Sequence, residues 1–443
     1  MKFHKIKYFT SSVLLSVFMS VSAQTLPTVP VPQAVNPNKN FQSSFPYGNQ
    51  RTNPHNPNEL SDIQRRNYEM IMRDVEENQR QIDAEIQRQS VIKMLLEKGF
   101  ASQSEILDTS CYQNAFNEIN QMLKGEIPMN LARAVFLVEN AYYGDSLKYS
   151  DYENFIKNKV ALCKSKIQEE KLNPNDNLVK NITIYRLLTD TLKIKTGGKI
   201  INSYPISYDY YDYRSEENYD SHFVTKLMRS GIGQCYSMPL YYLILAEAMN
   251  SEAFWAFSPR HSFVKIQDDN GDWYNLELTC RAILSDAHYM NNSYIKSEAI
   301  RNRIYLEPLD KKNSIAQMLI SLARGYYVKY GMDDFYLKCA DTAMEYLSND
   351  LDALMLKSEY ETRLIRALGY LYGAENSDIL LERCPESAKH FEKREMLYKQ
   401  IDDLGYEDLP AELYARWLEH IAKEKAKSEK EKSIFLRPSL KRH

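Results

Sequence analysis

Apolar side chains recur at helical intervals through most of the first half of the chain. No proline or glycine occurs between residues 60 and 98. Within that stretch, charged residues separate apolar positions spaced as on one helix face, namely Ile71, Val75, Ile82 and Ile86. This pattern predicts a long helix. A strict heptad is not sustained, so a coiled coil is the weaker interpretation.

The helical pattern continues over residues 100–192. The segment NLARAVFLVENAYY has a broad apolar face, formed by Leu131, Ala134, Val135, Leu137, Val138 and Ala141. We therefore predict an N-terminal helical region over 58–192. The pair Gly197-Gly198 marks a break, and the Tyr-rich stretch SYPISYDYYDYRSEENYD after it is irregular. The next segment, SHFVTKLMRS, predicts a short amphipathic helix that ends at Gly231.

The middle of the chain combines one apolar helix with short strands. MPLYYLILAEAMN is apolar nearly all round, which predicts a buried helix. Pro239 has no N–H to donate and fits only near a helix start, so this helix begins at or just after Cys235. AFWAF, HSFVKIQ and WYNLELT read as strands, and Asn270-Gly271 is a hairpin turn signal between the last two. A helix followed by a small antiparallel sheet predicts an α+β core over 193–311.

Helical periodicity returns over 312–425, and a charged tail, 426–443, follows it. The whole chain has 443 residues, of which 44% are hydrophobic and 26% charged, an ordinary mixture for a folded protein with a sizeable core. The net charge is −3 and the sequence shows no dominant basic face, so nucleic acid is not an expected partner.

The first residues, MKFHKIKYFTSSVLLSVFMSVSAQ, combine a Lys-rich start, a short apolar stretch and the small residues Ser22 and Ala23. This layout predicts a cleavable secretory signal over 1–23, with an uncleaved anchor as the alternative. Residues 24–57 are rich in Pro, Asn and Gln and predict a disordered linker. No later stretch reaches the roughly 18 apolar residues of a membrane span. We expect an exported protein, periplasmic or secreted, whose mature chain is soluble.

Export permits disulfides, but the six cysteines are far apart and no CxxC occurs. Neither a disulfide framework nor zinc-site spacing is present, and most of these cysteines are expected to be buried free thiols.

Cys235 differs, because it stands in GQCYSMPLYY at the predicted start of the buried helix. A helix N-terminus carries a partial positive charge and free N–H groups, which favour the thiolate form of a thiol placed there.

A nucleophilic thiol also uses an imidazole, and an acid that fixes the imidazole tautomer. His261 begins the second strand and Glu277 lies in the third. The hairpin between these strands makes the two residues cross-strand neighbours that face the helix start. The alternatives for the acid are Asp272 and Glu252, which lie nearby in the sequence.

The order Cys, His, acid resembles the transglutaminase-like branch of the papain-like thiol enzymes. The matching motifs are GQCYS, HSFVKI and WYNLELT. The family usually has aspartate in the last motif, ahead of a threonine; this chain has Glu277, with Thr279 in place. The resemblance covers about residues 195–300, and it implies a thiol enzyme, or a descendant of one, that acts on an amide or ester.

A closer resemblance is to bacterial transglutaminase-like proteins that carry tetratricopeptide repeats behind the core. LARGYYVKYGMDDFYLKCADTAMEYLSND is similar to one such repeat, with Tyr327, Gly331 and Ala343 at matching positions. Tyr336 and Ser348 depart from the repeat pattern. Many proteins of that group lack the cysteine, which this chain keeps.

We therefore expect an exported thiol hydrolase or acyl transferase with Cys235, His261 and Glu277 as its triad. Its substrate is a peptide or protein amide, and no metal or organic cofactor is implied. Gln234 is an oxyanion candidate by adjacency, with packing or capping of the turn as its alternative role. The rival hypothesis is an inactive scaffold whose helical repeats bind a protein partner.

Four further side chains near the core have default structural interpretations. His222 is expected at the surface, although it could reach the site, and His288 is expected to be structural. Trp255 and Trp273 either wall the site or, as the simpler interpretation, pack the small sheet.

Overall fold

The computed structural model describes residues 108–408, scattered positions between 72 and 92, and positions 419 and 423–427. The chain divides into two units, Ser16–Val91 and the remainder. Every described position between 72 and 92 is helical, in agreement with the helix predicted over 60–98. The predicted signal over 1–23, the linker over 24–57 and nearly all of the charged tail lie outside the described residues.

Four helices open the described part of the second unit: α2 (Ser110–Lys124), α3 (Leu131–Tyr142), α4 (Tyr149–Glu169) and α5 (Asn177–Thr189). Side-chain caps fix two of their starts, because Asn130 accepts from the N–H of Arg133 and Asp176 accepts from that of Val179. The apolar face predicted for α3 is buried along its whole length. The helical prediction for this region is therefore confirmed over its described residues.

A hairpin follows, formed by β1 (Leu192–Thr196) and β2 (Lys199–Ser203). Gly197 and Gly198 form its turn with φ of 54° and 74°, a region that favours glycine. The glycine pair interpreted from sequence as a break is thus a hairpin turn. Beyond it, β3 (Ser207–Tyr208) runs parallel to β4 (Ile232–Gly233). Between these strands lie η3 (Tyr219–His222) and α6 (Val224–Ser230), and α6 ends at Gly231 as predicted.

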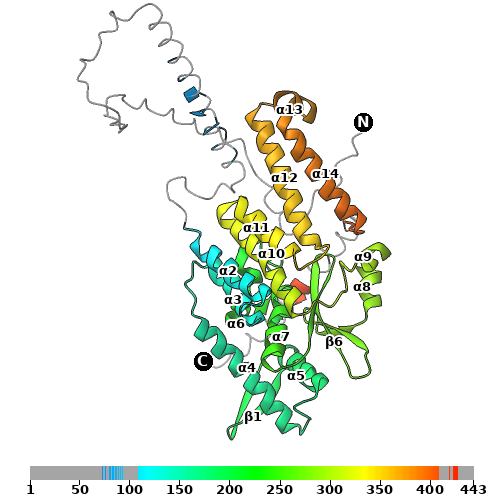
Figure 1. The fold of residues 1–443 in the computed structure, drawn as a ribbon. Coiled ribbons are helices and arrows are strands. Elements are labelled where there is room, and N and C mark those ends of the chain that lie inside the picture. The colour runs from blue at the N-terminus through cyan, green and yellow to red at the C-terminus, as the bar shows by residue number, and fades with distance from the viewer. Residues whose placement is uncertain are drawn as a thin grey trace, which may run out of the picture. The chain divides into compact units, whose positions relative to one another are not determined.

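Helix α7 (Ser237–Ala248) packs against a four-stranded antiparallel sheet, ordered β5-β6-β7-β8 (Figure 1). The strands are β5 (Phe254–Ser258), β6 (His261–Gln267), β7 (Trp273–Glu277) and β8 (Ala282–Leu284). Because successive side chains alternate between faces, β6 is buried on both sides. Val264 and Ile266 belong to the large core that includes α7, whereas Phe263 packs with Tyr289 in a smaller cluster.

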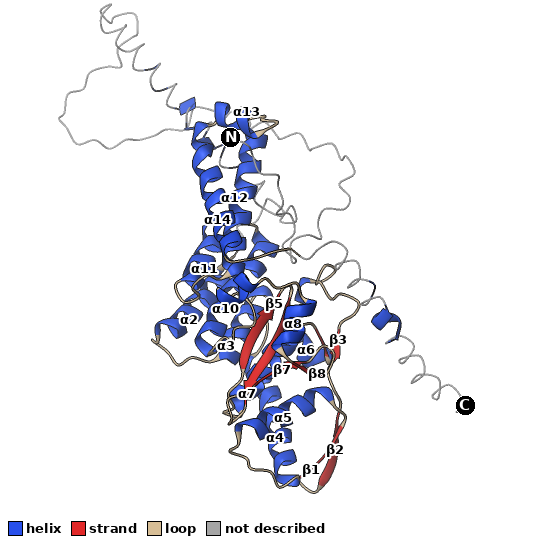
Figure 2. Cartoon of the chain, turned by 90° about the vertical axis from the view of Figure 1, so that its right-hand side faces the viewer, coloured by secondary structure: helices blue, strands red, loops and turns tan. Residues whose placement is uncertain are grey.

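Helices make up the rest of the described chain (Figure 2). Two short helices follow the sheet, α8 (Asp286–Asn292) and α9 (Ser297–Arg301). The region predicted to be repeat-like contains α10 (Lys311–Tyr330), α11 (Asp334–Met344), α12 (Leu351–Leu371), α13 (Ser377–Arg383), η4 (Pro385–Ser387) and α14 (Ala388–Asp403). Neighbouring helices pair here, α10 with α11 and α12 with α14.

One hydrophobic core spans the regions that the sequence analysis separated. It includes Phe116 of α2, Val135 of α3, Leu240 of α7 and Leu319 of α10. Helix α10 packs against α2, α3 and α11 together. The mixture of helices with small antiparallel sheets confirms the α+β prediction, and the repeat-like helices share their core with the helices that precede the sheet.

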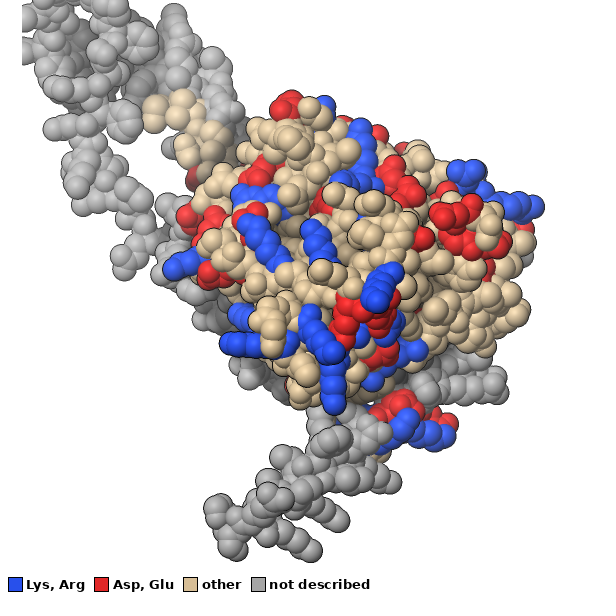
Figure 3. Space-filling model, turned by 90° about the horizontal axis from the view of Figure 1, so that it is seen from below, with Lys and Arg blue, Asp and Glu red and all other residues tan. Residues whose placement is uncertain are grey.

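The surface carries both charge signs. On the face drawn in Figure 3, basic and acidic side chains are interspersed. Lys226 with Asp209, Arg186 with Glu170 and Lys357 with Asp341 are examples of ion pairs. Within the described residues, no helix combines the length and apolar character needed to cross a membrane.

Gly233 allows β4 to pass close to α6 and α7, and Gly233→Ala should lower the free energy of unfolding by about 1–3 kcal/mol. The added Cβ would lie 2.9 Å from Ser237 Oγ and 3.0 Å from both terminal methyl carbons of Leu227. Gly369→Ala is the matched control, since its Cβ meets nothing closer than 3.7 Å and alanine favours α12 by about 0.5–1 kcal/mol. Urea unfolding measures both, and an unchanged Gly233→Ala protein would contradict this packing.

Candidate active site

Cys235 lies in the turn that leads from β4 into α7. Tyr236 is the N-cap residue of α7, so the helix begins just after Cys235, as predicted. The turn is closed by the Gln234 N–H, which donates to Ser237 Oγ at 3.0 Å. The Ser262 hydroxyl of β6 donates to the Cys235 carbonyl at 2.6 Å. These bonds hold the half-buried thiol between the helix start and the histidine strand.

His261 is the first residue of β6, and the structure brings its ring to Cys235 and Glu277 together. Its Nε2 lies 2.5 Å from Glu277 Oε2. The Cys235 side chain is near enough to the ring to help raise the pKa of the imidazole. Because Glu277 occupies Nε2, Nδ1 is the ring nitrogen left for the thiol. This is the order of contacts in which an imidazole can accept a proton from a thiol while a carboxylate holds its other nitrogen.

The register of the sheet explains how the acid reaches the histidine. Val264 of β6 pairs with Leu276 of β7. Glu277 therefore lies beside Phe263, two positions along β6 from His261, and the two functional side chains meet diagonally. Diagonal neighbours in an antiparallel pair are within reach of long side chains. The prediction that the two residues approach across the hairpin is confirmed, with this offset.

The Glu277 carboxylate is buried and accepts four hydrogen bonds. Oε1 accepts from the Thr279 N–H at 3.0 Å and from the Thr279 hydroxyl at 2.7 Å. Oε2 accepts from the Tyr289 hydroxyl at 2.9 Å and from the His261 ring. Burial alone would raise the pKa of Glu277, but the charge and hydrogen bond of His261 and the bonds from Thr279 outweigh it and lower the pKa to about 2. Glu277 is thus an anion at neutral pH.

The same contacts act on the histidine in the opposite direction. Burial alone would lower the pKa of His261, yet the Glu277 charge, the influence of Cys235 and the hydrogen bond to Glu277 hold it well above its usual range. The ring therefore favours the protonated form when the acid and the thiol are both in place. A proton that His261 takes from the thiol would stay on the ring, because the Glu277 charge stabilises the imidazolium form.

Tyr289, which the sequence analysis missed, is positioned by a buried lysine. Lys265 Nζ contacts the Asp286 carboxylate at 2.9 and 3.0 Å and donates to the Leu306 carbonyl at 3.0 Å. These bonds hold the start of α8 against the sheet. The Tyr289 ring then stacks on Phe263 with 4.2 Å between centroids, so that its hydroxyl meets Glu277. In the sequence, the one sign that α8 is held against the sheet was Lys265, a lysine at a buried position of β6.

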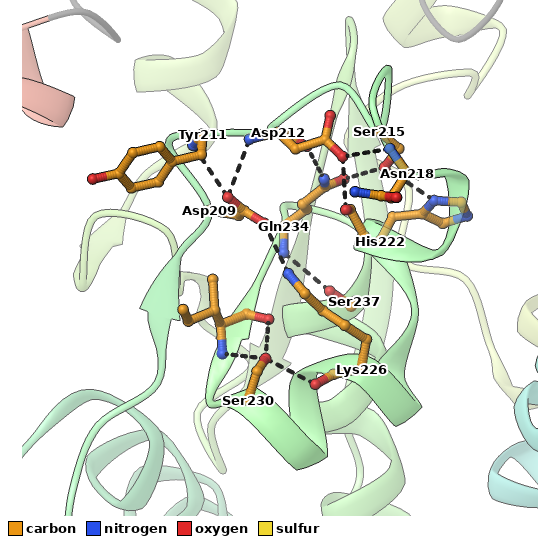
Figure 4. A network of polar contacts seen from close by, with 12 residues as sticks. Asp209, Tyr211, Asp212, Ser215, Asn218, His222, Lys226, Ser230, Gln234 and Ser237 are labelled. Carbon is orange, nitrogen blue, oxygen red and sulfur yellow. Dashed lines mark hydrogen bonds and ion pairs between the residues drawn. The ribbon is translucent and has the colours of Figure 1, made fainter.

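Gln234, the oxyanion candidate, has its side chain engaged elsewhere. Its amide nitrogen donates to the Asp212 carbonyl, and its Oε1 accepts from the Ser215 hydroxyl at 3.1 Å. Figure 4 shows the side chain directed into the loop that carries Asp212 and Ser215. The structure therefore favours the alternative interpretation, in which Gln234 fixes the turn rather than facing a substrate.

The loop held by Gln234 is organised around the buried Asp212 carboxylate. Oδ1 accepts from the backbone N–H groups of Glu216 and Glu217, at 2.8 and 3.1 Å. Oδ2 accepts from the Asn218 N–H at 3.0 Å and from the Ser221 hydroxyl at 2.7 Å. The Tyr-rich stretch that looked irregular in sequence is thus an ordered loop beside the Cys235 turn.

The remaining histidine, tryptophan and acidic residues differ in their surroundings. His222 is half-buried and not exposed at the surface as expected, with its ring packed against Tyr219 and Tyr236. Burial of the ring, with the Arg324 charge, lowers its pKa to about 4. Trp255 is fully buried in the core. Four residues lie apart from the triad contacts: exposed His288, exposed Trp273, and the alternative acids Asp272 in the hairpin turn and Glu252 before β5.

The six thiols are all free. Cys111, Cys163, Cys339 and Cys384 are buried, Cys280 is exposed and Cys235 is intermediate. Among the described residues, no group of three or more His, Cys, Asp or Glu side chains is arranged to hold a metal ion.

Comparisons with protein-family models, curated proteins and solved structures found no match. The case for a function therefore depends on the geometry of this site.

Glu277→Gln should lower the free energy of unfolding by about 3 kcal/mol at pH 7, because a buried charge partner is lost. The folded pKa of about 2 lies below the usual 4.5. The Glu277 contribution is therefore complete above pH 4.5 and is lost as pH falls towards 2. The difference between wild type and variant, measured by urea unfolding, should shrink over that window. Glu252→Gln, at an exposed position, is the control; a pH-independent difference would contradict the burial argument.

Cys235 should be alkylated by iodoacetamide at pH 7.5 before the other five cysteines. Cys280 is the informative competitor, since it is exposed but burial of its sulfur and the Glu277 charge raise its pKa to about 11. His261→Ala should remove most of the advantage of Cys235, because the thiolate loses its proton acceptor. Peptide mass mapping at successive times gives both rates. Equal labelling of Cys235 and Cys280 in the wild type would count against an activated thiolate.

Proposed function

We propose that the chain is an exported thiol hydrolase or acyl transferase with a transglutaminase-like core, acting on a peptide or protein amide. The observation that carries the proposal is the His261 ring bonded to the buried Glu277 carboxylate at 2.5 Å, with the Cys235 side chain near enough to raise the pKa of the same ring. Three elements, the α7 turn, β6 and β7, converge to make it. This arrangement is that of a nucleophile, its base and the group that orients the base.

In the proposed reaction, His261 Nδ1 first takes the thiol proton, and the resulting Cys235 thiolate then attacks the carbonyl carbon. The carbon–sulfur bond forms and the carbonyl electron pair moves onto oxygen, giving a tetrahedral oxyanion. When the oxyanion collapses, the carbon–nitrogen bond breaks and the leaving amine takes the proton from His261. A thioester remains on Cys235. Water or an amine then attacks it, gives its proton to His261, and the thiol returns as the product leaves.

Glu277 stays ionised throughout this cycle. Its pKa of about 2 lies far below that of the imidazole, so the proton rests on His261 and is not passed further. Its bond to Nε2 fixes the ring orientation and stabilises the imidazolium that forms. The replacement of the family's usual aspartate by the longer glutamate is accommodated here, because Thr279 and Tyr289 hold the carboxylate from two further directions.

Two further parts complete the proposal: the signal over 1–23 is cleaved, and the helices of 312–425 bind a protein partner.

The rival scaffold hypothesis needs a test that leaves the fold intact. Truncation within 312–425 is unsuitable, because α10 contributes to the core around α7. Tyr370 of α12 and Met396 of α14 are 56% and 64% exposed, so serine at these positions alters the surface alone.

Cys235→Ala should abolish formation of an acetyl-enzyme from p-nitrophenyl acetate, at a stability cost of only about 1–2 kcal/mol. His261→Ala should slow acetylation by about 100-fold or more, since general base assistance is lost. The double variant should be no worse than Cys235→Ala alone, because the residues act as one unit. Intact-protein and peptide mass spectrometry follow the label, with Cys280→Ala as the matched control that retains wild-type behaviour.

The scaffold hypothesis predicts the reverse pattern in cells that lack the wild-type gene. There, Cys235→Ala would restore function fully, and Tyr370→Ser with Met396→Ser would not. A folded Cys235→Ala protein that complements completely would end the catalytic proposal.

A further inference from the structure

The segment before the Tyr-rich loop is fixed against the Cys235 turn by backbone bonds. Tyr208 is the last residue of β3, and its partner in the parallel pair is Gly233, two residues before Cys235. The Ser207 N–H donates to the Gly231 carbonyl and the Asp209 N–H to the Gly233 carbonyl, both at 2.8 Å. Tyr208 therefore cannot move along the strand without breaking bonds to the segment that carries the thiol.

A second tie joins the same segment to the chain that follows the acid. Arg281 Nη2 donates to the Ile206 carbonyl at 3.2 Å. Arg281 follows Glu277 by four residues, just beyond the Thr279 bonds to the carboxylate. Tyr208 is thus held between the nucleophile turn on one side and the end of the acid strand on the other.

The Tyr208 phenol lies close enough to Cys235 and Glu277 for their charges to affect its pKa. Burial first, and then the charges of Cys235, Tyr210 and Glu277, raise its pKa well above the usual value. The phenol therefore keeps its proton at neutral pH and is a hydrogen-bond donor there. Its ring meets that of Tyr210 edge-on, with 5.1 Å between centroids.

Two tyrosines near the triad, Tyr236 and Tyr289, have hydroxyl groups that are already hydrogen-bonded. The Tyr236 hydroxyl pairs with Ser321, and the Tyr289 hydroxyl donates to Glu277. Within the described part of the chain, no acceptor is hydrogen-bonded to the Tyr208 hydroxyl, and none to the backbone N–H of Cys235. With the Gln234 amide committed to Asp212 and Ser215, these two groups are donors left beside the thiol.

We propose that the Tyr208 hydroxyl donates a hydrogen bond to the oxyanion that forms when Cys235 attacks a carbonyl, together with the Cys235 backbone N–H. This inference rests on the proposed function and adds a catalytic residue to it. The tyrosine keeps its proton throughout and changes no bond. Donors that are already oriented towards developing charge stabilise a transition state without reorganisation, which is why single donors of this kind have large effects on rate.

Two reagents that attack the same thiol separate this role from others. Acetylation by p-nitrophenyl acetate passes through a tetrahedral oxyanion, whereas alkylation by iodoacetamide displaces iodide at a saturated carbon and forms none. Tyr208→Phe keeps the ring and removes only the hydroxyl. It should slow acetylation of Cys235 by about 100-fold and leave its alkylation rate unchanged. Tyr204→Phe, at a position that is 70% exposed, should alter neither rate.

Each other outcome overturns the inference in a recognisable way. If both rates fall in Tyr208→Phe, the hydroxyl acts on the thiolate or on the fold and not on an oxyanion. If neither rate falls, the hydroxyl has no part in the reaction, although the triad can still operate. A wild-type Cys235 that is alkylated but never acetylated removes the proposed function itself, and with it the role of Tyr208.

Discussion

A carboxylate can be buried in a protein only where hydrogen bonds replace its water shell, and Glu277 meets that condition with four donors. The donors come from separate places: His261 at the start of β6, Thr279 in the turn after β7, and Tyr289 on α8. The sheet, the turn and α8 must all be in position for the charge to be tolerated. Assembly of the site and packing of this part of the fold are therefore the same event.

Successive side chains of β6 point to opposite faces of the sheet, and each face supports a different part of the site. Ser262 donates to the Cys235 carbonyl on the side of α7, where Val264 and Ile266 enter the large core. Lys265 and Phe263 point to the other side, where they hold α8 through Asp286 and Tyr289. A strand buried on both faces can in this way fix the nucleophile turn with one set of residues and the support of the acid with the other.

Sequence patterns predicted those parts of the site that depend on local signals. Pro239 fixed the start of α7 just after Cys235, and Asn270-Gly271 marked the hairpin that brings His261 and Glu277 together. Local signals could not predict Tyr289, because α8 is short and its place depends on the ion pair between Asp286 and the buried Lys265. They also could not reveal that Asp212 orders the Tyr-rich loop, because its partners are mainly backbone N–H groups. The half-buried position of His222 likewise depends in part on the Tyr236 ring, which comes from another segment.

The continuity of the core has a consequence for how the chain folds. Helices that precede the sheet, helix α7, and helices α10 and α11 after the sheet bury their apolar faces in one cluster. The described helices α2 to α7, α10 and α11 should then fold and unfold as one cooperative unit, since removing any of them exposes apolar surface on the others. A change in α10 can consequently alter the population of molecules in which Cys235 is correctly held, without touching the site.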